Sequence, residues 1–348
     1  MKNPEIFDVT IIGGGPAGLY SAFYSGLREM KTKIIEFQPK LGGKIHVYPE
    51  KMIWDVGGHS PLPGAKLIEQ LVEQGLTFKP EVLLNEKVES IERNEENIFI
   101  LKTASGQLHF SKTVIAAVGS GILNPQKLNI EGAERFEVSN LNYTVKSIKH
   151  FKDKIVIISG GGNTAIDWAN ELVPVAKKVY LTYRKDALTG HEAQVTQLME
   201  SSVECIFHTS ITKLIAGENN EFIERVELTN HVTNQIEYLS VDEVIINHGY
   251  EQDASLLANS KLGIEIDNFY IAGNPNSESS VPGLYAAGDI LKYDGKINLI
   301  AGTFQDAANA VNKAKQYIQP DASDVAMVSS HNEVFKERNR ELVKQLVR

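Results

Sequence analysis

The feature that most constrains the fold of this chain is a pattern that occurs twice: an apolar strand, a glycine-rich turn and a helix. The first turn is Gly13–Gly18, and the second, Gly160–Ala165, begins 147 residues later. The strands before the turns, such as Ile155–Ile158, are unbroken runs of apolar residues. Such runs are typical of a parallel sheet covered on both faces. The repeat therefore predicts two α/β units, each able to bind a nucleotide, in a chain of 348 residues.

The segments that follow the two turns repeat as well. Alternating polar and apolar residues at 98–110 and at 223–239 predict an antiparallel hairpin after each copy. Two buried-strand patterns, at 113–119 and 243–249, end in glycine, and we interpret them as points where the chain passes between domains. The expected division is a first domain at 1–117, a second at 118–247, a return to the first at 248–330, and a charged tail at 331–348.

The first turn has the spacing of a phosphate-binding glycine motif. Gly13 permits the tight turn, Gly15 lets a pyrophosphate approach the backbone, and Gly18 lets the helix pack on the sheet. The phosphates would lie at the positive end of that helix. Glu36 ends the next strand, near the spacing expected for an acid that binds a ribose hydroxyl. The alternative is a glycine turn without a ligand.

The second turn differs in the residues that follow it. Gly160 and Gly162 keep the motif, and Ala165 takes its third position. The next strand ends not in an acid but in Arg184 and Lys185. A cationic pair attracts a 2′-phosphate, whereas an acid repels it, so this half favours NADPH over NADH. A solvated charge pair at a strand end is the alternative.

Composition excludes several classes of function. The chain has 35 Lys and Arg against 44 Asp and Glu, a net charge of −9, which argues against wholesale binding to nucleic acid or to an anionic membrane and leaves a local basic patch as the alternative. Cys205 is the only cysteine, which excludes an intrachain disulfide, a CxxC redox centre and a multi-cysteine metal site. We predict no metal. The lack of a signal-type segment and of an 18-residue apolar run predicts a cytoplasmic protein without a membrane span.

A third motif near the C-terminus is more specific than either glycine turn. The segment Val281–Asp289 is a short apolar strand that places Asp289 directly after Gly288. With both turns, it makes the chain resemble the thioredoxin reductases and related flavoproteins with two dinucleotide domains. The resemblance implies an α/β fold with two Rossmann-like domains of the three-layer ββα type, the NADPH domain inserted into the FAD domain. It also implies that Asp289 holds the ribityl chain of FAD; a simple helix or turn cap is the alternative.

The residues at the redox positions narrow the resemblance. Thioredoxin reductases carry a CxxC before the second turn, where this chain has Asn142–Ser147 without sulfur. A related group, thought to reduce small disulfides, has a cysteine where this chain has Ala17. The chain is most similar, over nearly its whole length, to the bacterial thioredoxin-reductase-like ferredoxin/flavodoxin-NADP reductases. The resemblance implies a homodimeric FAD enzyme that passes electrons from NADPH to ferredoxin or flavodoxin.

The resemblance also assigns residues to each cofactor. Tyr48 and His331 are expected on the two faces of the flavin ring, and the helix start near Ala301 is expected beside its N1 atom, where a helix dipole stabilises negative charge. The residues expected to hold FAD are Gly13, Gly15, Pro16, Ala17, Gly18, Glu36, Gly43, Lys44, Tyr48, Asp289, Ala301, Thr303 and His331. The residues expected to hold NADPH are Gly160, Gly162, Asn163, Thr164, Ala165, Arg184 and Lys185. No acid–base catalytic residue is expected, because hydride transfer depends on the alignment of the cofactors.

The chain departs from the family pattern at two places. In the 2′-phosphate loop, family members often carry two arginines and a third one four residues later, where this chain has Arg184, Lys185 and Thr189. Because a lysine is a point charge rather than a planar fork, a weaker preference for NADPH is expected. Lys44 stands where many relatives have glutamine. Tyr48 has the alternative of an ordinary half-buried tyrosine, and His331 that of an exposed tail residue. Both tryptophans, Trp54 and Trp168, are interpreted as packing residues.

Other functions stay open at this stage. One is an NADPH-dependent reductase of small acceptors such as quinones, ferric complexes or oxygen, and another is a non-enzymatic flavin redox sensor. The tail at 331–348 has five Lys and Arg against three Glu, which suggests a docking surface for an acidic ferredoxin. Packing of the tail as an amphipathic helix is the alternative.

Overall fold

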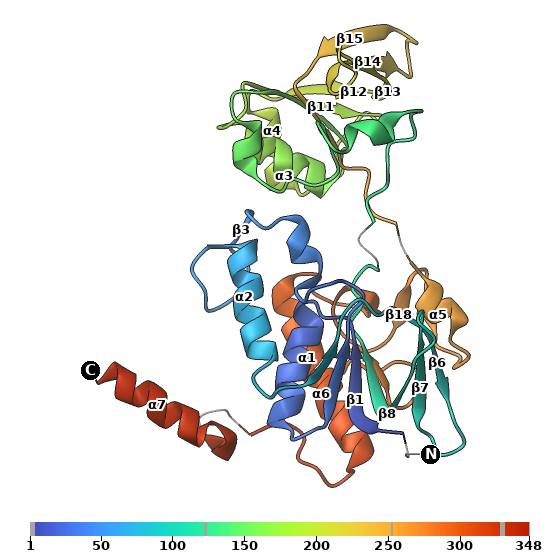
Figure 1. Ribbon diagram of the computed structural model, residues 1–348, viewed down its shortest axis with the longest axis vertical. Helices are drawn as coiled ribbons and strands as arrows, with labels where there is room; N and C mark the ends of the chain where they lie inside the picture. Colours follow the sequence, from blue (N-terminus) through green and yellow to red (C-terminus); the bar gives the residue numbers. More distant parts are fainter. Residues whose placement is uncertain (1–3, 122–123, 252, 328–330, 348) are drawn as a thin grey trace. The chain divides into compact units, whose positions relative to one another are not determined.

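The computed structural model describes residues 4–121, 124–251, 253–327 and 331–347, and the chain folds as two compact units (Figure 1). Unit 1 comprises Met1–His46, Lys51–Ile122 and Gln252–Arg348, and unit 2 comprises Val47–Glu50 and Leu123–Glu251. Each unit has its own sheets and its own buried apolar core.

Unit 1 is built on a seven-stranded sheet of order β5-β2-β1-β8-β7-β6, with β19 also paired to β8. Its strands are β1 (Ile6–Ile12), β2 (Thr32–Ile35), β5 (Glu81–Leu83), β6 (Val88–Arg93), β7 (Phe99–Thr103), β8 (Leu108–Ala116) and β19 (Leu284–Ala286). All pairs among β5, β2, β1, β8 and β19 are parallel, whereas β6 and β7 pair antiparallel. Ile11 lies between Ile34 and Ile115 across the sheet, and all three are fully buried. Apolar burial on neighbouring strands thus fixes this register.

Three helices cover the sheet of unit 1. They are α1 (Pro16–Leu27), α2 (Gly64–Gly75) and α6 (Ile300–Ile318). α1 packs against both α2 and α6, so the helix after the first glycine turn lies beside a helix from the far end of the chain (Figure 1). The smaller elements are η1 (Gly43–Val47), β3 (Met52–Ile53), β4 (Leu62–Pro63), α5 (Ser255–Asn259), β17 (Ile266–Asp267), β18 (Tyr270–Ala272), η4 (Gly288–Ile290), β20 (Leu291–Lys292), η6 (Glu333–Phe335) and α7 (Lys336–Leu346).

Unit 2 repeats the parallel arrangement with a five-stranded sheet of order β12-β11-β10-β16-β9. These strands are β9 (Leu141–Asn142), β10 (Ile155–Ser159), β11 (Lys178–Tyr183), β12 (Glu204–Phe207) and β16 (Glu243–Ile246). A separate antiparallel sheet contains β13 (Thr209–Ala216), β14 (Ile223–Asn230) and β15 (Ile236–Ser240). The helical elements are α3 (Asn163–Leu172), α4 (Glu192–Met199), η2 (Ala133–Phe136) and η3 (Ile148–Phe151).

The local predictions hold with two differences. The pattern at 113–119 is not a separate strand, because β8 runs without a break from Leu108 to Ala116 and pairs with β7 and β1 in turn. Trp168 is confirmed as a packing residue, 3 % exposed. The same interpretation of Trp54 is wrong, since this ring is 74 % exposed in a loop between β3 and β4.

Among the described residues, an aromatic contact joins the tail to the rest of unit 1. The ring of Phe335 lies 5.4 Å from that of Phe78, measured between centroids. Leu342 and Leu346 of α7 are exposed, so these residues do not pack against the rest of the described chain. Within the described residues, no helix is both long enough and apolar enough to cross a membrane.

Candidate dinucleotide sites

The first glycine turn joins β1 to α1 in unit 1. A methyl group on Gly18 would overlap the carbonyl oxygen of Gly13, so the turn closes on itself only with glycine there. Gly15 is the N-cap of α1, Pro16 follows it, and neither a side-chain cap nor an acidic residue lies in the first turn. The positive end of α1 is therefore left without a compensating group from its own first turn, as an anion site requires.

Glu36 reaches this turn from the end of β2. Its carboxylate is 7 % exposed and accepts hydrogen bonds from the backbone N–H of Gly14 (2.5 Å) and of Gln38 (2.7 Å). Each carboxylate oxygen has a second lone pair, so Glu36 can still accept from ribose hydroxyls. The same turn is closed from the other side by Gly43, whose Cβ position would lie 2.8 Å from the Cα of Gly15.

The Gly288–Asp289 motif lies at the same place as the first turn. Gly288 has φ +77°, and a methyl group on it would lie 3.0 Å from Cβ of Ala17 and 3.6 Å from Cγ2 of Thr303. Three motifs distant in sequence, at α1, η4 and α6, therefore converge in unit 1. The Asp289 side chain is partly exposed and forms no hydrogen bond or ion pair with another described residue. Its carboxylate is available to a ligand.

The start of α6 has the same character as the start of α1. Leu299 is its N-cap, without a side-chain cap, and no acidic residue lies in its first turn. Ala301 is exposed, whereas Thr303 is buried with its hydroxyl donating to the carbonyl of Ile300 at 2.7 Å. This helix end can stabilise negative charge on a neighbouring group.

The second glycine turn, in unit 2, joins β10 to α3. Gly160 has φ +151°, and a methyl group on it would lie 2.5 Å from the carbonyl oxygen of Asn247. Gly162, the N-cap of α3, has no atom within 4 Å of its Cβ position. The turn is thus tightly packed at its first glycine and open at its second, where a pyrophosphate needs the space.

Arg184 and Lys185 follow β11 and are both exposed. Neither forms an ion pair with another described residue, which leaves both charges available to an anion. Thr189 instead binds the turn: its N–H and hydroxyl both donate to the carbonyl oxygen of Gly161, at 2.8 and 3.1 Å. Where the family pattern has an arginine, Thr189 therefore contributes no charge and instead fixes the loop to the glycine turn by two hydrogen bonds.

The helix start also holds this loop. Asn163 accepts a hydrogen bond from the backbone N–H of His191 at 2.8 Å through its side-chain oxygen. Ala165 is buried, in keeping with close packing of helix on sheet. Of the residues predicted for NADPH, Asn163 thus has a structural partner within the loop, and the geometry leaves Thr164 exposed at the first turn of α3.

Sequence reasoning missed one residue beside the second turn. His248 follows β16, and its Nε2 lies 2.9 Å from the hydroxyl of Ser159, the last residue of β10. Burial, with a further contribution from the charge of Arg184, lowers the pKa of His248 below its usual range. The signal was present in the topology, because residues after adjacent parallel strands meet at one edge of the sheet.

Two further predicted flavin residues, Lys44 and Tyr48, lie on or just after η1. Tyr48 packs against the apolar core of unit 2 that contains Val145 and Trp168. Lys44 is exposed on η1, in unit 1. The placement of Tyr48 against the flavin ring and the contact of Lys44 with FAD stay predictions.

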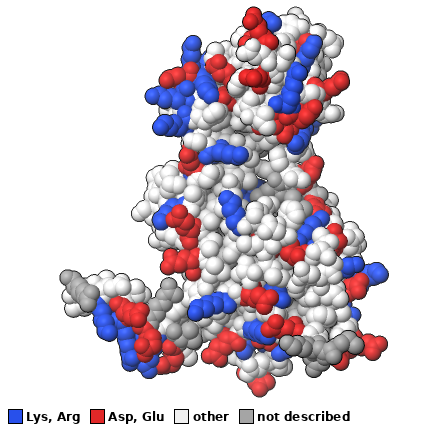
Figure 2. Space-filling view, in the orientation of Figure 1, with Lys and Arg blue, Asp and Glu red and all other residues white. Residues whose placement is uncertain are grey.

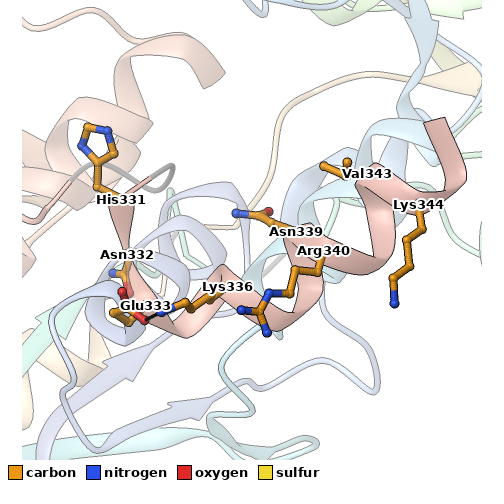
Figure 3. A pocket seen from close by; sticks show the side chains of 8 residues that line it. All are labelled: His331, Asn332, Glu333, Lys336, Asn339, Arg340, Val343 and Lys344. Carbon is orange, nitrogen blue, oxygen red and sulfur yellow. Dashed lines mark hydrogen bonds and ion pairs between the residues drawn. The ribbon is translucent and has the colours of Figure 1, made fainter. Parts of the chain in front are cut away.

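His331 is exposed and lies at one end of a shallow hollow on the tail (Figure 3). The hollow is lined by His331, Asn332, Glu333, Lys336, Asn339, Arg340, Val343 and Lys344. Figure 2 shows both signs of charge on the tail helix, and exposed pairs such as Arg340 with Glu337 (2.8 Å) account for part of them. No group of three or more potential metal-ligating side chains occurs among the described residues.

Comparison with known proteins assigns the chain to a family. Residues 7–314 match the family model of the pyridine nucleotide-disulphide oxidoreductases. The chain belongs to this family. It is 77 % identical to a protein of Bacillus mycoides and 78 % identical to one of Bacillus cytotoxicus, each named ferredoxin–NADP reductase 1, with both chains covered completely. A protein of Exiguobacterium sibiricum, named ferredoxin–NADP reductase 2, is 70 % identical over 100 % of this chain and 99 % of its own length.

Solved structures agree on the fold. Lactococcus lactis thioredoxin reductase superposes with a TM-score of 0.76 at 24 % identity, covering 90 % of this chain and 99 % of its own. The thioredoxin reductase of T. acidophilum gives 0.75 at 23 % identity, over 89 % and 98 %. These neighbours confirm the predicted α/β class with two Rossmann-like units.

Cys205, the only cysteine, lies in β12, and burial raises the pKa of its thiol.

Proposed function

We propose that this protein is an NADPH-dependent flavoenzyme, a ferredoxin–NADP reductase, that transfers electrons from NADPH through FAD to ferredoxin. The observation that carries the proposal is full-length identity of 77–78 % to ferredoxin–NADP reductases. The lone cysteine, Cys205, supports it further, because a dithiol relay of the thioredoxin reductase kind needs two cysteines.

Unit 1 fits FAD by its own geometry. A negatively charged pyrophosphate suits the uncapped start of α1, ribose hydroxyls suit Glu36, and the unpartnered carboxylate of Asp289 suits a ribityl hydroxyl. The start of α6 would stabilise negative charge on the reduced ring. When bound, FAD accepts two electrons as a hydride and gives them up one at a time.

Unit 2 fits NADPH. The open space at Gly162 and the uncapped start of α3 suit the pyrophosphate, and the exposed pair Arg184 and Lys185 suits the 2′-phosphate. The clamp of Thr189 on the Gly161 carbonyl holds this loop in place. Hydride transfer needs alignment of two rings rather than an acid or base, so we assign no side chain a proton-transfer role.

The finer parts of the proposal concern partners and location. Flavodoxin is a second acceptor, since a one-electron protein acceptor needs only access to the flavin edge. The family resemblance supports a homodimer, and the lone cysteine accords with the reducing cytoplasm. Reduction of small acceptors is not favoured by the relatives that this chain matches.

Two measurements test the function. The purified protein should show flavin absorption that bleaches on addition of NADPH, and NADPH-dependent reduction of cytochrome c should rise strongly when ferredoxin is added. A colourless protein would contradict the flavoenzyme, and a rate independent of ferredoxin would favour reduction of small acceptors instead.

The variant Asp289→Ala tests the FAD site. Its carboxylate would accept a charge-assisted hydrogen bond worth about 1.5–3 kcal/mol, so FAD retention should fall by at least about tenfold. NADP⁺ affinity, which depends on unit 2, should stay unchanged. Normal flavin content in the purified variant would refute this placement.

A further inference from the structure

A buried ion pair lies directly behind the Gly288–Asp289 turn. The side chains of Lys296 and Asp306 are 4 % and 1 % exposed, and the Lys296 ammonium binds Oδ2 of Asp306. Asp306 lies in the second turn of α6, and Lys296 lies in the loop between β20 and α6. Both residues belong to unit 1, and neither was singled out by the sequence patterns.

The Asp306 carboxylate gathers donors from both sides of Asp289. The backbone N–H of Gly288 donates to Oδ2 at 3.1 Å, and the phenol of Tyr293 donates to Oδ1 at 3.1 Å. The carbonyl of Asp306 accepts from the hydroxyl of Ser277 at 2.9 Å. One side chain of α6 thus fixes the residue before Asp289 and the loop that follows it.

Burying an ion pair has a desolvation cost, because both charges lose their contact with water. Apolar residues of similar volume often serve stability as well or better, so stability alone does not account for this pair. The pair does place a full negative charge beneath the Gly288 N–H, and a charged acceptor holds that donor more firmly than a neutral one. The Gly288 backbone has φ +77° and lies against Ala17 and Thr303, so a small shift there would move Asp289 relative to the first glycine turn.

We propose that Asp306 and Lys296 are positioning residues for the flavin site. Asp306 holds the Gly288–Asp289 turn in its binding geometry, and Lys296 supplies the buried positive charge that pairs with the Asp306 carboxylate. Asp289 then presents its carboxylate without reorganisation when a ligand hydroxyl arrives. The inference rests on the proposed binding of FAD in unit 1, and it assigns neither residue a contact with the cofactor.

The test replaces the pair without leaving an unpaired buried charge. The double variant Lys296→Met with Asp306→Leu should stay folded, with a melting temperature of the FAD-free form close to that of the parent protein. Its dissociation constant for FAD, measured by quenching of flavin fluorescence, should rise about tenfold or more, since a charge-assisted hydrogen bond to the turn is lost. Affinity of the same variant for NADP⁺ should stay unchanged.

A matched control removes another buried charge that contacts the same helix, α6. Arg28, the buried C-cap residue of α1, donates to the side chain of Asn312 on α6 at 2.6 Å, about two turns beyond Asp306. Arg28→Met should lower the melting temperature and leave the FAD dissociation constant unchanged. If both changes weaken FAD equally, the pair acts only through general stability and the proposal is overturned.

A milder variant decides the question if the double variant does not fold. Tyr293→Phe removes only the hydroxyl group that donates to Asp306 and should release FAD several-fold faster from the holoenzyme. An unchanged release rate overturns the proposal in that case. The outcome is separable from the proposed function. If the parent protein binds no FAD, the proposed function itself is contradicted. If the parent protein reduces ferredoxin but the variants hold FAD as tightly as the parent, only this inference is contradicted.

Discussion

The open space at Gly162 gives the sharpest prediction for the nucleotide site. The Cβ position of Gly162 has no atom within 4 Å, and its backbone, at φ −94° and ψ 178°, suits any residue. Gly162→Ala therefore introduces no clash within the protein. The variant loses a little as a helix N-cap and gains a little from a stiffer unfolded chain, so its stability should stay within about 1 kcal/mol of the parent.

Nucleotide binding should respond very differently. The added methyl group occupies the space through which a pyrophosphate approaches the N-terminal amides of α3. Loss of one hydrogen bond between a backbone N–H and a charged phosphate costs about 1.5–3 kcal/mol, so the dissociation constant for NADP⁺ should rise about ten- to hundredfold. Isothermal titration calorimetry of the FAD-loaded protein measures this constant directly, and FAD content should not change.

Two control variants separate an effect on nucleotide binding from an effect on stability. Gly57→Ala adds a methyl group at another open position, in unit 1, and should change neither stability nor NADP⁺ affinity. Gly160→Ala places its methyl group 2.5 Å from the Asn247 carbonyl at φ +151°, and should destabilise the protein outright. A Gly162→Ala protein that melts normally and binds NADP⁺ as tightly as the parent would refute the assignment of this turn.

Three other predictions follow from charges. Replacing Arg184 and Lys185 by uncharged residues should lower the preference for NADPH over NADH by about ten- to hundredfold, as the ratio of kcat/KM measures, and an unchanged ratio would dismiss the loop as a 2′-phosphate site. Deleting 336–348 should leave FAD content and flavin reduction by NADPH intact, but slow ferredoxin reduction at low salt and flatten its salt dependence, whereas parallel salt curves would exclude a docking role. Burial, and then the charge of Lys33, lower the pKa of His109, so as the pH falls the unfolded chain binds a proton at this residue before the folded chain does. The free energy of unfolding should therefore fall as the pH drops below about 6.5. Denaturant titrations at pH 7.5 and 5.5 should show a smaller fall in that free energy for His109→Gln than for the parent protein.

Much of the chemistry is local in sequence and could be predicted from it. A glycine turn between an apolar strand and a helix depends on residues within a few positions of one another, so Gly13–Gly18 and Gly160–Ala165 identify both proposed nucleotide turns. The end of the following strand is equally local, which is why Glu36 and the pair Arg184 and Lys185 could be singled out. Cysteine count alone excluded a dithiol relay, because chemistry that needs two sulfurs cannot be supplied by Cys205.

The tertiary structure decided what depends on contacts between distant segments. Only the fold brings Gly288 to Ala17 and Thr303, because strand pairing of β19 with β8 and packing of α1 on α6 join the two ends of the chain. Lys296 and Asp306 are close in sequence, but their burial also depends on the folded surroundings. Exposure is decided in the same way: both tryptophans have the same apolar ring, yet the neighbours of Trp168 bury it while Trp54 stands in solvent. Sequence spacing fixes which groups a turn or helix end presents, whereas burial and long-range hydrogen bonds depend on which surfaces the folded chain brings together.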